Sequence, residues 1–263
     1  MRAYIIYGAR SKRAILKQWR RARGLSAGGQ RTTRPSREFN LFHPKLEILP
    51  PSQRELWAEL GETPRHFVLY GGTALALRLG HRQSQDFDFF SNESFEPSTL
   101  MHGVGYLKQA RVDQRGDNTL TVVAERGEPV RVSFFGDLHL SHVHEPDLAP
   151  DNGIQVASLL DLAATKLRTI QQRAEAKDYR DIDAAIRSGI HLAEGLAAAV
   201  AIYGKTFNPL TTLKALTYFK DGNLQSLSDE IQERLLKAAT MIELKGLPQV
   251  VARPGIIMSE SKR

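Results

Sequence analysis

The sequence predicts an α/β (α+β) protein in which a sheet-forming half precedes a helical half. The apolar run HFVLY, which ends at Tyr70, is typical of a buried strand. After the glycine pair GG, residues 71–72, the sequence has from Thr73 the pattern of a short helix that ends at Gly80, and DFDFF, residues 86–90, alternates like a strand. Apolar residues at helical spacing recur over residues 192–244. These observations predict a strand–helix–strand unit followed by packing helices.

Composition describes a globular protein and excludes several kinds of site. The chain has 263 residues, of which 41% are hydrophobic and 25% charged. It contains no cysteine, so disulfides, thiolate metal sites and cysteine nucleophiles are excluded. No apolar run approaches the roughly 20 residues of a membrane helix. We therefore expect a soluble, cytoplasmic protein without a membrane partner.

Charge is distributed unevenly and suggests the domain boundaries. Residues 1–44 hold eleven Lys or Arg and one acid, so they carry +10 and the remainder −3 of the net +7. We expect residues 1–44 to form a basic, flexible extension, 45–150 an α/β domain and 151–263 a helical region. The extension could bind phosphate backbones. It could equally lack a dedicated role, and its arginine-rich, acid-poor composition also resembles an organelle transit peptide.

The paired glycine lies where the predicted strand meets the predicted helix. Free backbone amides at a helix N-terminus favour anions such as phosphate. Gly71 and Gly72 would let the backbone approach a phosphate closely, and Thr73 could add a hydroxyl. The alternative is that the two glycines only form a tight turn.

Two aspartates follow on the next predicted strand. Side chains alternate along a strand, so Asp86 and Asp88 share one face, roughly 7 Å apart, while Phe87 and Phe89 point to the other. Mg²⁺ commonly binds one or two carboxylates together with substrate phosphates. The pair therefore predicts a magnesium site, and the alternative is a solvated polar face of an edge strand.

The glycine pair and the aspartate pair together resemble a known family. The segment GGTALALRLGHRQSQDFDFFS, residues 71–91, resembles the AbiEii/AbiGii toxin branch of the nucleotidyltransferase fold that DNA polymerase beta shares. The resemblance implies a mixed sheet with flanking helices and an active-site cleft between the α/β domain and the helical region. It also implies Mg²⁺-dependent transfer of a nucleotidyl group from an NTP to an RNA such as tRNA. The protein would be the toxin of a type IV-like toxin–antitoxin system, with a cognate antitoxin as a further partner.

The resemblance also assigns roles to particular residues. It implies that Asp86 and Asp88 bind the metal and that a second group of residues binds the nucleotide. Two residues of this second group, Arg82 and Ser84, could instead contact the acceptor. Arg82 could also be a surface charge. The implied nucleotide-binding residues are Gly71, Gly72, Thr73, Arg82 and Ser84, and the implied catalytic residues are Asp86, Asp88, Lys166 and Asp178.

The downstream segment VASLLDLAATKLRTIQQRAEAKDYRDIDAAI, residues 156–186, is similar to later motifs of the same branch. Lys166 lies at the border of an apolar helical stripe and faces inward, where its amine could contact phosphates or extend beside the core. Asp178 and Asp181 share a helix face. The resemblance favours Asp178, which would support the metal site or activate the acceptor hydroxyl. Alternatively, Asp178 favours the helix dipole and Asp181 pairs with Lys177.

One departure from the wider fold concerns a third carboxylate. Many members supply it from a neighbouring strand, whose candidate here is VRVSFFG, residues 130–136, with Ser133 at its centre. A single-metal arrangement or a weaker base is then expected in place of two-metal catalysis. Asp113, Asp117 and Asp137 could substitute.

Three other functions remain open at this point. The enzyme could modify a protein or a small molecule in place of RNA. The missing carboxylate could mark an NTP-binding module or regulatory protein that has lost catalysis. The fold could also serve as the interacting partner in a two-protein system.

Overall fold

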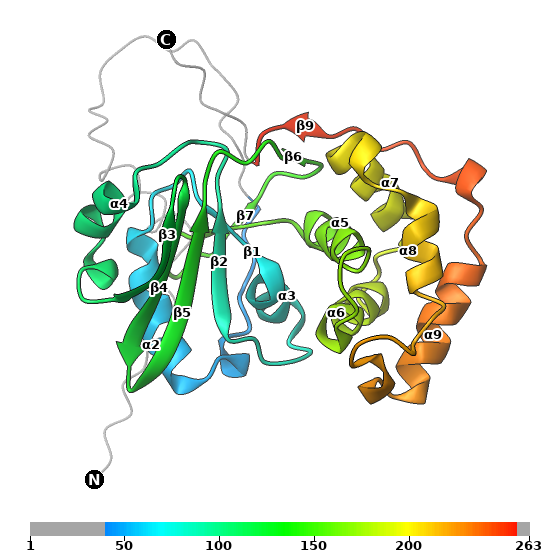
Figure 1. Cartoon of the computed structure of the whole chain (residues 1–263), viewed down its shortest axis with the longest axis horizontal. Helices are drawn as coiled ribbons and strands as arrows, with labels where there is room; N and C mark the ends of the chain where they lie inside the picture. The colour runs from blue at the N-terminus through cyan, green and yellow to red at the C-terminus, as the bar shows by residue number, and fades with distance from the viewer. Residues whose placement is uncertain (1–39, 257–263) are drawn as a thin grey trace. The chain divides into compact units, whose positions relative to one another are not determined.

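The structure is a computed structural model of the chain, and it describes residues 40–256 (Figure 1). Most of the predicted basic extension, residues 1–39, lies outside the described residues, as do residues 257–263. The helices are α2 (Pro51–Glu59), α3 (Gly71–Leu79), α4 (Pro97–Gly103), α5 (Leu159–Thr169), α6 (Ala176–Arg187), α7 (Leu192–Tyr203), α8 (Pro209–Ala215) and α9 (Asp229–Thr240).

A seven-stranded mixed sheet forms the first half, in the order β3-β4-β5-β2-β1-β8-β7. Strand β2 lies between β5, to which it is parallel, and β1, to which it is antiparallel. This arrangement confirms the predicted α/β class. The seven strands are β1 (Val68–Tyr70), β2 (Asp86–Phe90), β3 (Arg111–Gly116), β4 (Thr119–Arg126), β5 (Glu128–Phe135), β7 (Asp147–Leu148) and β8 (Gln155–Val156), and a separate pair joins β6 (Ser141–His142) to β9 (Arg253–Pro254).

The first hydrophobic core includes residues of α3 and the side chains on the phenylalanine face of the sheet. Phe87 and Phe89 are fully buried, as the alternation of β2 predicts. The ring of Phe89 stacks on that of Phe134 with centroids 5.3 Å apart, and Trp57 of α2 lies 6.3 Å from Phe87. Helix α2 therefore covers the phenylalanine face, and the aspartates of β2 lie on the opposite face.

A second hydrophobic core joins helices α5 to α9. Helix α3 connects the two halves, because it contacts β1 and β2 as well as α5 and α6 (Figure 1). The helix begins at Gly71, directly after β1, and ends at Leu79, where the C-cap Gly80 has a left-handed φ of 66°. The end agrees with the prediction, whereas the start lies two residues before the predicted Thr73, because both glycines belong to the first turn of the helix. The sheet extends beyond residue 150 through β8, and the proposed division into domains stays a prediction.

Within residues 40–256, no single helix is long and apolar enough to cross a membrane. One pair, Ala176–Arg187 with Leu192–Thr206, meets the length and composition test jointly but is bent by 118° at its break.

Candidate active site

The two aspartates of β2 lie at the meeting point of three strands. Asp88 is half-buried and pairs in register with Tyr70 of β1 and Ser133 of β5, whereas Asp86 is exposed. Because Tyr70 is the last residue of β1, Asp88 lies beside the start of α3.

The glycine turn packs directly on this carboxylate. Gly71 has a φ of +76°, a backbone conformation that residues with a Cβ rarely adopt. A Cβ at Gly71 would also lie 2.5 Å from Oδ2 of Asp88. Glycine is therefore required twice, once by the turn and once by the close approach of the carboxylate.

The second glycine packs on the residues that precede β2. A Cβ at Gly72 would lie 2.6 Å from Nη2 of Arg82 and 3.0 Å from Oγ of Ser84. No side chain of the described residues caps the start of α3. The first amides of the helix, which have no intrahelical acceptor, therefore lie beside Asp88, Arg82 and Ser84.

The side chain of Thr73 has a different contact from the one expected. It is fully buried, and its hydroxyl donates a hydrogen bond of 2.5 Å to the backbone carbonyl of Asp86. The hydroxyl thus ties α3 to the first residue of β2. Any contact of Thr73 with phosphate would have to come from its backbone amide.

Lys166 of α5 forms a buried ion cluster with α6. Its Nζ lies 2.7 Å from Oδ1 of Asp178 and 2.7 Å from Oδ2 of Asp181, and its side chain is 8% exposed. The inward orientation expected for Lys166 and the shared face of the two aspartates are both present. The ammonium already neutralises two carboxylates, which the sequence did not indicate.

Asp181 extends this cluster to the glycine turn. It accepts hydrogen bonds from Nε2 of His81 at 2.7 Å and from Nε and Nη2 of Arg82 at 2.6 and 2.8 Å. The alternative pairing of Asp181 with Lys177 is wrong, because the Lys177 ammonium lies 2.8 Å from Glu175. Arg82 is therefore held between Asp181 and Gly72 and is not a free surface charge.

Burial and neighbouring charges shift the pKa values of these carboxyls in opposite directions. Burial, with a smaller contribution from Asp86, raises the pKa of Asp88 to about 6, although Lys166, Arg131 and Arg173 oppose the rise. For Asp181, burial acts upward, but the hydrogen bonds from His81 and Arg82 outweigh it and lower the pKa. The pKa of Asp178 is also lowered, because hydrogen bonds from Arg173 and Lys166 outweigh its burial.

The donor set on β2 fits a hard divalent cation. Two carboxylates on one strand face supply the oxygen ligands that Mg²⁺ prefers, and water and substrate phosphates commonly complete its shell. Burial raises the pKa of Asp88 most, and repulsion by Asp86 adds to the rise; a cation between the two groups would relieve this repulsion. Within residues 40–256, no cluster of three or more His, Asp or Glu has metal-binding geometry, so the aspartate pair would need ligands from the substrate.

A hydroxyl occupies the strand position beside Asp88. Ser133 is 6% exposed and accepts a 3.3 Å hydrogen bond from Thr121 of β4. Asp113, one of the possible substitutes, forms ion pairs with Arg131 and Arg111. Neither Ser133 nor Asp113 therefore presents a free third carboxylate to the aspartate pair.

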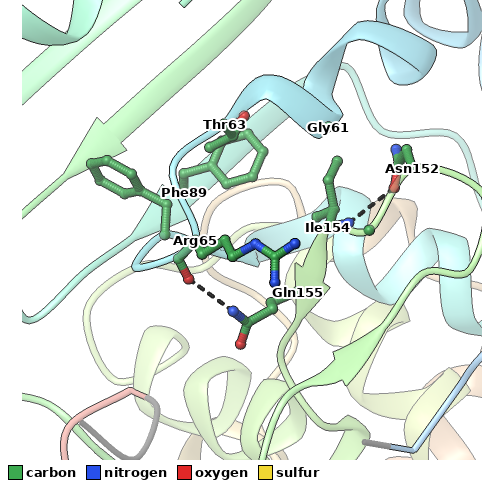
Figure 2. Close-up of a pocket in the computed structure, with 9 residues that line it drawn as sticks. Gly61, Thr63, Arg65, Phe89, Asn152, Ile154 and Gln155 are labelled. Carbon is green, nitrogen blue, oxygen red and sulfur yellow. Dashed lines mark hydrogen bonds between the residues drawn. The ribbon is translucent and has the colours of Figure 1, made fainter. Parts of the chain in front are cut away.

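A small cavity lies elsewhere on the sheet (Figure 2). Its volume is about 50 Å³, enough for water but not for a nucleotide. Gln155 donates to the carbonyl of Arg65, and the amide of Ile154 donates to Asn152 (Figure 2). The cavity lies near the start of β1, whereas the glycine turn follows its end. It is lined by Gly61, Thr63, Arg65, Phe67, Phe89, Asn152, Gly153, Ile154 and Gln155.

Comparison with known proteins identifies the family. The model of the nucleotidyl transferase AbiEii toxin family, of the type IV toxin–antitoxin system, matches residues 56–245. The chain belongs to this AbiEii family. It is accordingly a nucleotidyltransferase of the toxin type, and the match spans the aspartate pair, the glycine turn and the Lys166 cluster.

Relatives of this AbiEii protein include both sequences and solved structures. An uncharacterized protein of Aquifex aeolicus (strain VF5) is 31% identical over 166 residues, which are 62% of this chain and 78% of the relative. MenT4, a nucleotidyltransferase toxin from Mycobacterium tuberculosis H37Rv, is 18% identical with a TM-score of 0.49, over 74% of this chain and 83% of its own. A putative nucleotidyltransferase from H. pylori is 16% identical with a TM-score of 0.43, over 72% and 91%.

The structure adds residues that the sequence did not single out in this AbiEii protein. Arg131 neighbours Asp86 in register, His81 holds Asp181, and Arg173 holds Asp178 with a 2.8 Å contact from Nε. None has a periodic or motif signal of its own. Only the expected alternation of residues 130–136 would have placed Arg131 on the same sheet face as Ser133.

We expect Gly71→Ala to reduce both stability and nucleotidyl transfer. The left-handed backbone costs about 1–2 kcal/mol with a Cβ, and the methyl group also displaces the Asp88 carboxylate. Gly127 is the matched control, because its φ is +79° and a Cβ there meets nothing within 4 Å. Urea unfolding should show a loss in both alanine variants, and transfer assays a loss only in Gly71→Ala. Equal activity in the two variants contradicts the role of Gly71.

We expect Asp181→Ala to lower the free energy of unfolding by about 3–5 kcal/mol, because Lys166 and Arg82 would lose a buried counter-ion. Lys177→Ala on the same helix removes an exposed ion pair with Glu175 and should cost at most about 1 kcal/mol. Urea unfolding monitored by circular dichroism measures both. Similar losses in the two variants would refute the importance of the cluster.

The lowered pKa values of Asp178 and Asp181 predict a loss of stability in acid. A carboxyl with a lower pKa in the folded state adds stability that is full above its unfolded pKa of about 4 and is lost as pH falls through the folded value. We therefore expect the free energy of unfolding to decrease below about pH 4. The decrease should be shallower in Asp181→Asn, which lacks one of the two groups. Parallel curves for the two proteins between pH 2 and 6 would argue against this assignment.

Proposed function

We propose that this protein transfers a nucleotidyl group from an NTP to an RNA acceptor, in a reaction that depends on a divalent cation. The observation that supports this function is the packing of the Asp88 carboxylate on Gly71 at the uncapped start of α3. Carboxylates for a metal and amides for phosphates thereby lie next to each other. This juxtaposition suits a metal–triphosphate substrate.

In the proposed mechanism, Asp86 and Asp88 would hold Mg²⁺, and the bound cation would supply charge neutralisation at the phosphates. The amides of Gly71, Gly72 and Thr73 bind phosphate oxygens. Ser84, whose hydroxyl lies beside Gly72, is placed to donate a further hydrogen bond to them. An acceptor hydroxyl attacks the α-phosphorus, the bond to the pyrophosphate oxygen breaks, and the hydroxyl proton passes to water.

In this mechanism Lys166 and Asp178 of the helical region position the site and do not contact the substrate. Lys166 neutralises Asp178 and Asp181, and Arg82 is held by Asp181, so this cluster fixes the position of the glycine turn relative to α6. A carboxyl with a lowered pKa is a weak proton acceptor near neutral pH. Asp178 therefore acts in positioning more readily than in activating the acceptor.

For the acceptor of the nucleotidyl group we propose an RNA such as tRNA. The family is one of toxins, and RNA is the acceptor that the family resemblance implied. Arg131 and Arg111 lie in register with Asp86 across the sheet, with side chains 50% and 65% exposed, and although both pair with Asp113 they add positive charge of the kind that contacts phosphates on this side of the site. A cognate antitoxin is expected from the type IV toxin–antitoxin system, and cytoplasmic localisation is proposed with it.

Incubation with each α-labelled NTP, Mg²⁺ and total RNA tests the function. We expect the unmodified protein to transfer label to an RNA band. The amount of labelled RNA should fall at least about 100-fold in Asp86→Ala and in Asp88→Ala. Asp229→Ala, an exposed carboxylate in the first turn of α9, is the control and should retain the signal.

The possible results separate the alternatives. Full transfer by both site variants would refute the aspartate pair as the active site. Mg²⁺-dependent NTP binding without any transfer would favour the binding module that Ser133 suggests, since this residue replaces a third carboxylate. Label in a protein or in a small molecule would show that this molecule, and not RNA, is the acceptor.

A further inference from the structure

The cations around the aspartate pair differ in how fully they are already engaged. Lys166 contacts two carboxylates and its side chain is 8% exposed. Arg82 is 17% exposed, with Nε and Nη2 on Asp181 and Nη1 on the carbonyl of Gln83. Neither has much capacity left for a substrate. The helical side must therefore supply positive charge to a nucleotide from another residue.

Arg173, in the turn between α5 and α6, has this capacity. Its side chain is 45% exposed, and Asp178 holds it by Nε at 2.8 Å and Nη2 at 3.2 Å, with Glu175 3.5 Å from the same Nε. No described residue accepts a hydrogen bond from Nη1. The guanidinium is thus fixed at one edge and open at the other, which is the arrangement a bidentate phosphate ligand requires.

Arg173 also lies within electrostatic reach of the aspartate pair. Its charge acts on Asp88, and the Asp88 charge acts on Arg173 in return. A continuous series of contacts supports this placement, because Asp178 binds both Arg173 and Lys166, and Lys166 binds the Asp181 that holds Arg82 against Gly72.

A second arginine provides an internal comparison. Arg234 of α9 holds Asp183 of α6 by Nε at 2.7 Å and Nη2 at 3.1 Å, and its side chain is 39% exposed. The two arginine–aspartate pairs are therefore alike in geometry and exposure. Each arginine also experiences the charge of a nearby glutamate, Glu175 for Arg173 and Glu230 for Arg234, but Asp88 acts on Arg173 alone of the two.

We propose that Arg173 is a substrate-binding residue that contacts the phosphates of the nucleotide from the helical side, and that Asp178 positions it. This inference rests on the proposed nucleotidyl transfer at Asp86 and Asp88. A triphosphate with one Mg²⁺ retains negative charge and lies next to two carboxylates, so a fixed guanidinium there lowers the electrostatic cost of binding.

Calorimetric titration of the full-length protein with inorganic triphosphate and Mg²⁺ tests the inference without involving base or acceptor. We expect Arg173→Ala to raise the Kd at least about 10-fold, which is the loss of one charge-assisted hydrogen bond. Arg234→Ala should bind within about twofold of the unmodified protein. Transfer assays at varied NTP should show a raised KM in Arg173→Ala, with the same ranking of variants.

Thermal unfolding of both variants separates binding from folding, because each loses one arginine–aspartate pair of α6. If Arg173→Ala does not fold, Arg173→Gln keeps a hydrogen-bond donor without the charge and should show the same loss of affinity. Unchanged affinity in the Arg173 variant overturns the inference, as does an equal loss in Arg234→Ala. Transfer that still depends on Asp88 would in either case leave the proposed function intact. Absence of triphosphate binding and of transfer in the unmodified protein would refute both.

Discussion

The buried contact of Asp181 with Lys166, Arg82 and His81 is the interaction on which the site depends. It joins three segments that are distant in sequence, namely α5, α6 and the turn between α3 and β2. A buried carboxylate and its cations are each expensive to desolvate, so the cluster stabilises the fold only while every partner is present. Its consequence is geometric: Arg82 is fixed against Gly72, and the start of α3 cannot move relative to α6 without breaking buried ion pairs.

The two glycines of the turn are closely packed by neighbouring side chains. Gly71 and Gly72 leave no room for a Cβ, because Asp88 Oδ2 lies on one and Arg82 on the other. The turn therefore separates an anionic group from a cationic group by the width of two residues of bare backbone. A nucleotide's phosphates carry negative charge while its metal carries positive charge, so a site for both needs this separation of opposite charges.

Sequence reasoning reached the parts of the site that follow from local periodicity. Alternation placed Asp86 and Asp88 opposite Phe87 and Phe89, and the structure agrees because one sheet face is covered by α2. The helical stripe placed Lys166 inward. Periodicity could not name its partners, since these depend on how α5 packs against α6. The sequence did not predict a role for Arg173 for a related reason. This residue lies in a polar turn without a repeating pattern, and only its tertiary contacts give it a role.

Ser133, in the position where a third carboxylate was expected, reduces the number of anionic groups that the protein offers to a cation. Burial and the charge of Asp86 together raise the pKa of Asp88, and a carboxylate at position 133, in register with Asp88, would have added a further negative charge. A hydroxyl bonded to Thr121 is neutral and keeps the strand position packed. With fewer anionic ligands the protein would hold a cation less tightly by itself, and the substrate's own phosphates would form the larger part of its coordination shell. If a metal binds here, this composition favours its binding together with the nucleotide over its binding before it.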